Sequence, residues 1–496
     1  MGGNDRHGKK KKIAIISVSA LILVAMVVAV AVGVTKSHKG GNDEKKPATT
    51  SKAIETVCQP TDYKETCQNA LSEKAGNVTD PKELVKIGFQ IAIEKLQEVI
   101  NNSDTLKEIA KDNLGNQALQ NCRELIEYSI DDLKRSADKI GPFEVTKLKE
   151  YVEDLKILLW TQRSYPHGLK DASDIATANP ISLKPDVIVA KDGTGKYKTV
   201  NEALKDIPKD NVLKTFVIYI KEGVYSEQVV LDKHMTNVMF IGDGPTKTKI
   251  TGNKNYADGV QTFKTATVAV IGDYFIAKDM GFENTAGARG HQAVALRVQS
   301  DLSIFYNCQI DGYQDTLYTQ THRQFYRDCI ISGTIDFIFG DAAAVFQNCK
   351  MIVRKPGPNQ SCIVTAQGRL DKREPTGIVL HNCTISGEKG FDAATTMAYL
   401  GRPWKMYSRT IVMQSQIDNV INPLGWMEWT GTTNHETSWF GEFSNRGLGA
   451  ATNQRVKWYK LATPEEAGAF APGSILLGDK WIMPSGVPYV AGMMRV

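Results

Sequence analysis

The chain has 496 residues, which allows a large hydrophobic core and excludes a peptide hormone or a miniprotein held together by disulfides alone. Its formal charge of +5 is concentrated at the N-terminus, because residues 1–40 carry seven basic residues and one acidic residue and the other residues sum to −1. This nearly neutral remainder disfavours a nucleic-acid binder, which would need a broad basic face.

The N-terminal region combines a basic cluster with a long apolar segment. Four consecutive lysines, Lys9 to Lys12, precede an uncharged segment at residues 13–34. As a helix this segment would span roughly 33 Å, enough for a bilayer core, whereas the apolar part of a cleavable signal is usually ~7–15 residues long. We therefore expect residues 1–12 to form a cytoplasmic tail and residues 13–34 a transmembrane signal anchor that places the rest of the chain outside the cell. A long signal peptide that is removed, leaving a secreted protein, is the alternative.

An extracellular location makes two further features informative. Glycosylation sequons occur at four asparagines, Asn77, Asn101, Asn359 and Asn382. The eight cysteines are too few for a disulfide scaffold in so long a chain, but they suffice for two or three local bridges. Cys58 and Cys67 can close a hairpin of nine residues, whereas Cys122 has no evident partner in the same region.

Residues 53–164 are predicted to be helical, between two linkers. Residues 35–52 are polar and are expected to form a linker, and residues 165–184 are expected to form a second one. Between them, in residues 53–164, Asp80 and Pro81 predict a capped helix start. Apolar residues recur at helical spacing, and such stripes need partners, so we predict a small antiparallel helical bundle. The clearest stripe is Val145, Leu148, Val152, Leu155 and Leu159.

Residues 185–496 change to short β-branched strands that end in Asn, Asp or Gly. One short sequence motif recurs: a strand-like segment followed by Asn or Asp and then Cys. Its cysteines are Cys308, Cys329, Cys349 and Cys383, in steps of 21, 20 and 34 residues. A repeat of ~20 residues or more with short strands predicts a solenoid, and β-type repeats favour a parallel β-helix, in which equivalent residues stack between coils. We therefore predict an all-β parallel β-helix preceded by a small all-α bundle. A β-sandwich is the alternative, but it would not require this period.

Stacked coils would bring two aspartates together. Asp315 and Asp336 are 21 residues apart, the same step as from Cys308 to Cys329. Two close carboxylates cannot both ionise freely, so one pKa rises, which supplies a nucleophile and a general acid in one place. Asp336 also lies in an apolar segment, residues 334–340. A carboxylate there is costly to bury unless it is paired or hydrogen-bonded, which indicates a specific role. Aspartates that only decorate turns are the alternative interpretation.

Several motifs in residues 185–496 together resemble pectin methylesterases of the plant type. In chain order they are Gly223-Val224-Tyr225-Ser226-Glu227, Gln292-Ala293-Val294-Ala295-Leu296-Arg297, the run from Gly312 to Tyr318, the run from Asp336 to Gly340, and Leu400-Gly401-Arg402-Pro403-Trp404. The resemblance implies a right-handed parallel β-helix that hydrolyses the methyl esters of polygalacturonate, releases methanol and modifies the cell wall. It implies no cofactor.

The resemblance also implies catalytic roles. Asp336 matches the nucleophile that attacks the ester carbonyl. Asp315 matches the acid that protonates the departing methanol and then activates water as a base. Gln314 and Gln292 are similar to the amides that donate to the developing oxyanion, and Arg402 resembles the guanidinium that orients Asp336 and keeps it ionised.

Other positions are implied to bind substrate or to form a disulfide. Thr262 and Trp404 match substrate-contacting positions, as do Gln292 and Arg402. Trp426 is a further candidate for stacking on a sugar, and core packing is the alternative for both tryptophans. Cys329 and Cys349 resemble a disulfide pair beside the nucleophile, with a ladder of free, buried thiols as the alternative. No group of His, Asp and Glu has metal-ligand spacing, and no Gly-x-Ser-x-Gly motif occurs, which favours an aspartyl esterase over a serine esterase.

The helical segment resembles, more distantly, the pectin methylesterase inhibitor domain, a four-helix bundle. It departs from that family after Cys122, because a later cysteine and further helix are missing before the linker. The expected partners are therefore methyl-esterified pectin, the membrane through residues 13–34, and inhibitor proteins or the chain's own helical segment. A polysaccharide lyase or glycosidase, and a protein that mainly inhibits or binds, are the competing functions.

Overall fold

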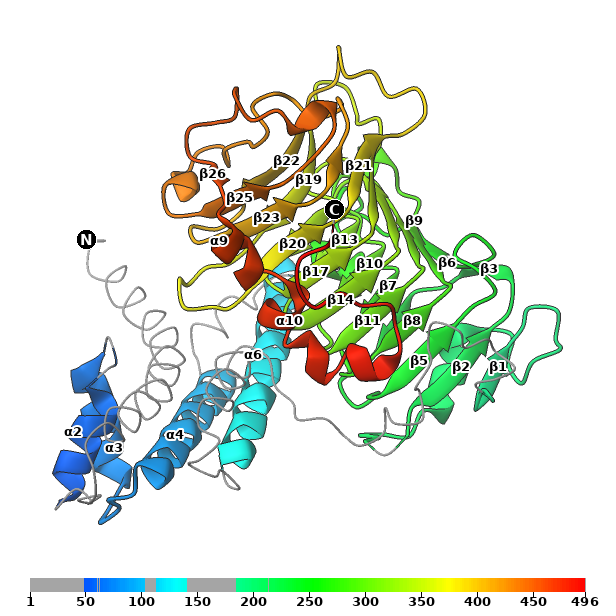
Figure 1. Ribbon diagram of the computed structural model, residues 1–496. Helices are drawn as coiled ribbons and strands as arrows, with labels where there is room; N and C mark the ends of the chain where they lie inside the picture. Colours follow the sequence, from blue (N-terminus) through cyan, green and yellow to red (C-terminus); the bar gives the residue numbers. More distant parts are fainter. Residues whose placement is uncertain are drawn as a thin grey trace. The chain divides into compact units, whose positions relative to one another are not determined.

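The computed structural model describes residues 49–59, 61, 63–102, 113–140, 184–212 and 214–495 (Figure 1). The chain divides into two compact units at residues 163 and 164. The predicted anchor at 13–34, the Val145–Leu159 stripe and nearly all of the second linker lie outside the described residues. Within the described ranges, no helix is both long and apolar enough to cross a membrane.

The first unit is helical. Thr49 caps its first helix by accepting a hydrogen bond from the Lys52 amide. The predicted helix start at Pro81 is confirmed, with the Asp80 carboxylate accepting from the Lys82 amide at 2.9 Å. The described helices are α2 (Thr50–Cys58), α3 (Lys64–Lys74), α4 (Pro81–Asn102) and α6 (Asn113–Ile140).

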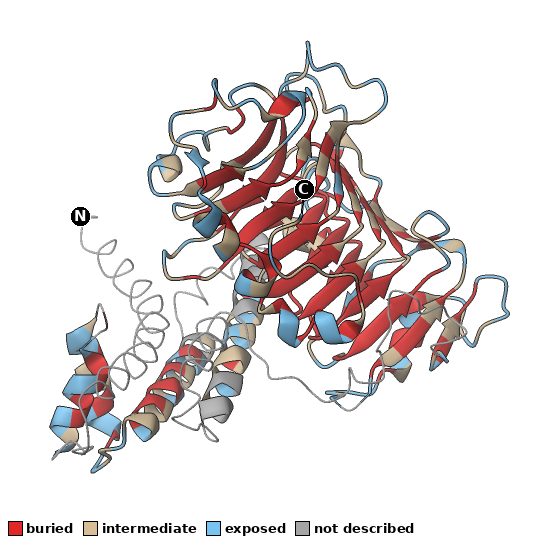
Figure 2. Cartoon of the chain, viewed as in Figure 1, coloured by how far each residue is buried: buried red, intermediate tan, exposed pale blue. Residues whose placement is uncertain are grey.

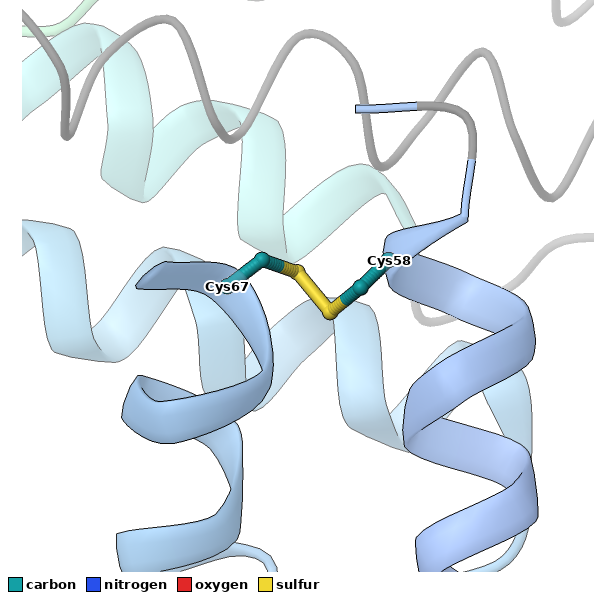
Figure 3. Close-up of a disulfide and its surroundings, with 2 residues drawn as sticks. All are labelled: Cys58 and Cys67. Carbon is teal, nitrogen blue, oxygen red and sulfur yellow. A yellow bond between two sulfur atoms is a disulfide. The ribbon is translucent and has the colours of Figure 1, made fainter. Parts of the chain in front are cut away.

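A disulfide joins the first two helices of this unit. Cys58 ends α2 and Cys67 lies in the first turn of α3, and their sulfurs are bonded across a nine-residue separation (Figure 3). Both residues are fully buried beside Leu71, Leu84 and Phe89. The predicted hairpin bridge is therefore confirmed, and it ties together two helices too short to be stable alone.

The second unit is a parallel β-helix of three sheets, as predicted (Figure 1). Sheet A contains β1 (Val187–Val189), β2 (Phe216–Ile220), β5 (Val238–Ile241), β8 (Ile276–Lys278), β11 (Ser303–Tyr306), β14 (Arg323–Arg327), β17 (Ala343–Gln347), β20 (Gly377–His381), β23 (Arg409–Met413), β25 (Trp439–Phe443) and β26 (Lys460–Leu461). Sheet B contains β3 (Gly223–Ser226), β6 (Thr248–Gly252), β9 (Gly281–Asn284), β12 (Gln309–Asp311), β15 (Ile330–Gly333), β18 (Lys350–Val353), β21 (Thr384–Gly387) and β24 (Gln416–Ile417). Sheet C contains β4 (Val229–Leu231), β7 (Val268–Val270), β10 (Leu296–Val298), β13 (Leu317–Thr319), β16 (Ile338–Gly340), β19 (Cys362–Gln367) and β22 (Ala398–Pro403).

Short helices cover parts of the coil. They are α8 (Val200–Ala203), α9 (Pro464–Ala469) and α10 (Pro472–Ile475), with single 3₁₀ turns at η3 (Leu204–Asp206), η4 (Thr262–Lys264), η5 (Ala288–Gly290), η6 (Asn434–Glu436), η7 (Leu448–Ala450), η8 (Gly478–Lys480) and η9 (Met483–Ser485). The strands between them are almost wholly buried (Figure 2).

The recurring Asn/Asp-Cys motif of the sequence forms the two-residue turn between a strand of sheet A and the next strand of sheet B. Its first residue has positive φ, which Asn and Asp adopt more readily than other side chains, and its second residue points into the core. The positive-φ residues form a column down the coil: Asp279, Asn307, Asp328, Asn348 and Asn382. Inside, Phe305, Tyr326 and Phe346 stack with centroids 4.9 and 4.4 Å apart. The polar turn and the apolar stack together make the repeat visible in the sequence.

The expectation of a disulfide between Cys329 and Cys349 is wrong in this structure. Both thiols are unpaired and buried in the core. The Sγ atom of Cys329 lies 3.3 Å from the carbonyl of Phe305, and that of Cys349 lies 3.4 Å from the carbonyl of Tyr326. Each thiol therefore lies near a carbonyl acceptor in the preceding coil. This arrangement agrees with the alternative expectation, a ladder of free, buried thiols.

Candidate active site

The two predicted catalytic aspartates lie just before two neighbouring inner strands of sheet C. Leu317 of β13 pairs with Ile338 of β16, so Asp315 and Asp336 stand two residues before equivalent positions on neighbouring coils. The Asp315 amide donates to the carbonyl of Ile335 at 2.9 Å. Both aspartates have positive φ, 63° and 49°, and both side chains are largely buried. The prediction that one coil separates them is confirmed.

Arg402 reaches Asp336 from β22, two strands away in the sheet. Its Nε and Nη2 atoms donate to the two carboxylate oxygens at 2.8 and 2.6 Å, a two-pronged contact. Its guanidinium also lies 4.3 Å from the ring centroid of Trp429. The guanidinium of Arg402 is thus contacted by a carboxylate and by an aromatic ring.

The two aspartates have different electrostatic surroundings. Burial, and next the negative charge of Asp336, raise the pKa of Asp315 well above its ordinary value, and Arg402 offsets only part of this. Burial also raises the pKa of Asp336, but the hydrogen bonds and charge of Arg402 oppose that rise directly. Because only Asp336 touches the guanidinium, we assign the lower pKa of the pair to Asp336.

Both predicted glutamines also lie before strands of sheet C. Gln314 immediately precedes Asp315, and Gln292 lies beside it on the previous coil in a parallel bridge. The carbonyl of Gln314 accepts from the Ala293 amide at 3.1 Å, which fixes the two backbones together. The backbones of the two half-buried glutamines therefore lie side by side, and Gln314 adjoins Asp315 in the chain.

Aromatic side chains gather on one face of sheet C. Tyr318 and Phe339 stack with centroids 4.3 Å apart, and Phe339 meets Trp404 edge to face at 6.1 Å. The predicted residue Thr262 lies in η4 beside Phe263, whose carbonyl faces Arg297 of β10 at 3.4 Å. The structure therefore places Thr262 near one side of this sheet, and Trp404 after its far strand.

Trp426 is not available for sugar stacking. Only 1% of it is exposed, its Nε1 donates to Glu442 at 3.1 Å, and it packs against Phe440. The expectation for Trp426 is therefore wrong, because the residue is part of the core. Trp429, three residues later, is the one that joins Trp404 at the aromatic face.

The four sequons differ in accessibility. Asn77 and Asn359 are exposed. The side chain of Asn382 donates to Asn348 at 2.8 Å and accepts from Arg446 at 3.1 Å, so its amide is engaged in the folded coil. The side chain of Asn101 lies outside the described part of the chain.

Known proteins resemble both units. A family model described as pectinesterase matches residues 186–479, and one described as plant invertase/pectin methylesterase inhibitor matches residues 52–168. The chain belongs to the pectinesterase family. The Arabidopsis thaliana protein named probable pectinesterase/pectinesterase inhibitor 21 is 44% identical over 566 residues, covering 99% of this chain and 84% of the relative.

Solved structures of pectin methylesterases share the fold of the second unit. That of the carrot enzyme is 50% identical, has a TM-score of 0.61, and covers 62% of this chain and 98% of its own. A pectin methylesterase in complex with a hexasaccharide is 26% identical with a TM-score of 0.50, covering 59% of this chain and 97% of its own. The pectinesterase family accounts for the β-helix and decides against the lyase and glycosidase alternatives, while the inhibitor match supports a helical module attached to an enzyme.

Proposed function

We propose that this pectinesterase demethylates pectin with Asp336 as nucleophile and Asp315 as general acid and base. The observation that carries this assignment is the two-pronged contact of Arg402 with Asp336 beside a second buried carboxyl on the next coil. A carboxylate oriented by a guanidinium is a positioned nucleophile, and a buried carboxyl without that contact retains its proton.

The first half of the reaction breaks the ester. An oxygen of Asp336 attacks the ester carbonyl carbon, and the carbonyl oxygen becomes negative in the tetrahedral intermediate. The side-chain amides of Gln292 and Gln314 are proposed to donate to that oxygen. As the intermediate collapses, the bond to the methoxy oxygen breaks, and Asp315 gives its proton to that oxygen, so that methanol leaves and an acyl-enzyme remains.

The second half restores the enzyme. Asp315, now a carboxylate, takes a proton from water while the water oxygen attacks the acyl carbon of the galacturonate. The bond to Asp336 breaks, Asp336 leaves as a carboxylate held by Arg402, and Asp315 is protonated again. The aromatic face formed by Trp404 and Trp429 is proposed to hold the sugar chain across the site, with Thr262 at the other side.

The most direct test replaces the nucleophile. The full-length Asp336→Asn variant is expected to lose methanol release from methylated pectin by at least about 10⁴-fold, because an amide cannot form the acyl-enzyme. Asp328→Asn is the matched control, since Asp328 also has positive φ but pairs with Arg327 and forms no contact with Arg402 among the described residues. Retention of more than a tenth of wild-type turnover by the Asp336 variant, with the fold intact by circular dichroism, would overturn the assignment.

The organisation of the whole chain is part of the proposal. We propose that the pectinesterase domain is delivered to the cell wall. We also propose that the helical domain binds a pectinesterase domain, either that of the same chain or that of another protein. The proposed boundaries are 1–12 for the tail, 13–34 for the anchor, 35–52 for a linker, 53–164 for the inhibitor-like domain, 165–184 for a linker and 185–496 for the enzyme. Mass spectrometry of the mature N-terminus would decide whether residues 13–34 are retained.

A further inference from the structure

The turn at residues 312–315, which carries Gln314 and Asp315, is contacted by an arginine that lies two coils further along the chain. Arg354 directly follows β18, and its side chain is 26% exposed. Its Nη1 atom donates to the carbonyl of Gly312 at 2.9 Å, and its Nη2 atom donates to the hydroxyl of Tyr313 at 3.0 Å. The central carbon of the guanidinium lies 4.0 Å from the centroid of the Tyr313 ring. One side chain therefore contacts both residues that precede Gln314.

The strand register explains how Arg354 reaches this turn. Strand β12 pairs with β15, β15 with β18, and β18 with β21, all in parallel. In this register Tyr313, Thr334, Arg354 and Glu388 take equivalent places on four successive coils, where the chain passes from sheet B to sheet C. The residue between Tyr313 and Arg354 is the short Thr334, which is only 1% exposed. A short side chain at the middle place allows the guanidinium to cross it and stack on the ring.

The backbone around the clamp is bonded to the coil of the nucleophile. The Asp315 amide donates to the carbonyl of Ile335 at 2.9 Å, and the Arg354 amide donates to the carbonyl of Gly333 at 2.8 Å. Both bonds end on the segment that leads to Asp336. The contact of Arg354 with residues 312 and 313 therefore fixes the turn against the coil that presents the nucleophile.

The guanidinium of Arg354 is held in turn by the next coil. Its Nε atom lies 3.7 Å from a carboxylate oxygen of Glu388, a half-buried residue. Glu388 accepts a hydrogen bond from the Lys355 amide at 2.6 Å, and its own amide donates to the carbonyl of Val353 at 2.8 Å. The carboxylate thus has a fixed place beside the arginine and favours the orientation that reaches Tyr313.

The backbone of the acid explains why the turn needs support. Asp315 has a φ of 63°, in the left-handed region that residues other than glycine adopt at a cost in free energy. Such a conformation persists only where surrounding contacts hold it. The hydrogen bond of the Asp315 amide holds one side of the residue, and the clamp on Gly312 and Tyr313 holds the segment before it.

We propose that Arg354 is a positioning residue of the demethylation reaction, which acts by clamping Gly312 and Tyr313. The clamp sets the positions of the two side chains that follow, Gln314 and Asp315. Loss of the clamp slows the chemical step more than it weakens pectin binding, because a shift of about 1 Å at a catalytic group can cost about 10²-fold in rate. The inference rests on the proposed roles of Gln314 and Asp315.

The acidity of Asp315 gives the clamp a directional readout. Burial is the main cause that raises the pKa of Asp315, followed by the charge of Asp336, while Arg402 opposes the rise. Tyr318, on the strand that follows, also faces the charge of Asp315. A loosened turn admits water, so the pKa of Asp315 falls and the basic limb of the pH–rate profile moves to lower pH. Loss of the positive charge of Arg354 alone would move the limb to higher pH.

The clamp itself is tested by hydrogen exchange of the full-length protein. Arg354→Met keeps the aliphatic part of the side chain and removes both donors, so the amides of residues 312–316 are expected to exchange at least about tenfold faster. The matched variant is Arg446→Met, because Arg446 also donates to a backbone carbonyl and to a side chain of earlier coils, those of Gln414 and Asn382, where sheet A passes to sheet B. It is expected to leave residues 312–316 unchanged. Equal exchange in the wild type and Arg354→Met would overturn the inference.

Kinetics with methylated pectin separate positioning from a merely structural role. Arg354→Met is expected to lower kcat at least about tenfold with KM within about twofold, and to move the basic limb to lower pH. Arg446→Met is expected to keep kcat within about twofold, even where both variants melt at a lower temperature. Arg354→Lys keeps the charge and one donor and is expected to regain part of kcat.

Tyr313→Phe removes only the hydroxyl contact of the clamp and is the milder variant if Arg354→Met folds poorly. It is expected to lower kcat less than Arg354→Met does, and the double variant is expected to be no slower than Arg354→Met, since both changes act on one contact. A kcat that falls equally in both arginine variants, or a basic limb that moves to higher pH, would overturn the inference. Absence of methanol release by the wild type would instead contradict the proposed function, and hydrogen exchange would still decide whether Arg354 holds the turn.

Discussion

The two ends of strand β16 carry the same chemistry in different surroundings. Before the strand, Asp336 lies one coil from the buried Asp315, and after it, the charge of Asp341 helps burial to raise the pKa of Glu374. At the first end the Arg402 guanidinium donates two hydrogen bonds to Asp336. At the second end Asp341 and Glu374 each accept hydrogen bonds from neutral donors. At the first end the guanidinium opposes the raised pKa of one acid directly, whereas at the second end burial raises the pKa of both acids. We infer that the contact with Arg402 distinguishes Asp336 from the other buried acids at the ends of this strand.

The largest expected effect in this comparison comes from removing that arginine. Arg402→Gln is expected to lower kcat by about 10²- to 10³-fold, because Asp336 loses its orienting donors and Trp429 its cation. Since Arg402 opposes the raised pKa of Asp336, the acidic limb of the pH–rate profile is expected to move to higher pH. Steady-state kinetics between pH 4 and pH 9 would check both effects. An unchanged acidic limb would show that Arg402 does not govern the ionisation of Asp336.

A smaller effect is expected from the aromatic ring that covers Arg402. Trp429→Ala is expected to raise KM about tenfold, because it removes a stacking surface and exposes the guanidinium. Trp426→Phe is the control: it lies in the core, so it is expected to lower the melting temperature and leave KM unchanged. Methanol release against pectin concentration, together with thermal melting, separates the two tryptophans. A change of KM in the Trp426 variant alone would contradict the assignment.

The smallest effect concerns stability at the other end of β16. The pKa of Glu374 is raised to about 9 from an ordinary value of 4.5, so the folded chain keeps a proton that the unfolded chain releases between these pH values. The free energy of unfolding therefore falls as pH rises through this window, by at most about 1.4 kcal/mol per pH unit. Glu374→Gln removes this proton, so its melting temperature is expected to fall less steeply from pH 5 to pH 9. Parallel curves for the variant and the wild type would exclude a protonated Glu374.

The sequence predicted the parts of the fold that repeat. The cysteine and aspartate spacings gave the coil length because the polar turn and the inward side chain recur on successive coils. The thiol pairing was not predictable in the same way, since stacking brings cysteines close whether or not they bond. Asn382 likewise satisfies a sequon, yet its amide is used by the turn column.

The parts that were missed lie on irregular segments. Trp426 and Trp429 are three residues apart in a loop, and no periodicity shows which of them faces the site. Glu374 belongs to the longest coil of the cysteine series, where the spacing changes to 34 residues and its alignment with Asp341 is lost. Arg402 was assigned through the family resemblance, because its contact with Asp336 spans 66 residues.

The protonation state of the carboxyl groups at pH 7 tests the central claim most directly. Infrared difference spectroscopy of the full-length protein, in which a protonated carboxyl has its own band, can compare the wild type with Asp315→Asn. The account predicts that this variant lacks one protonated-carboxyl band of the wild type, because Asp315 carries the catalytic proton. An identical band in the wild type and the Asp315 variant would contradict it.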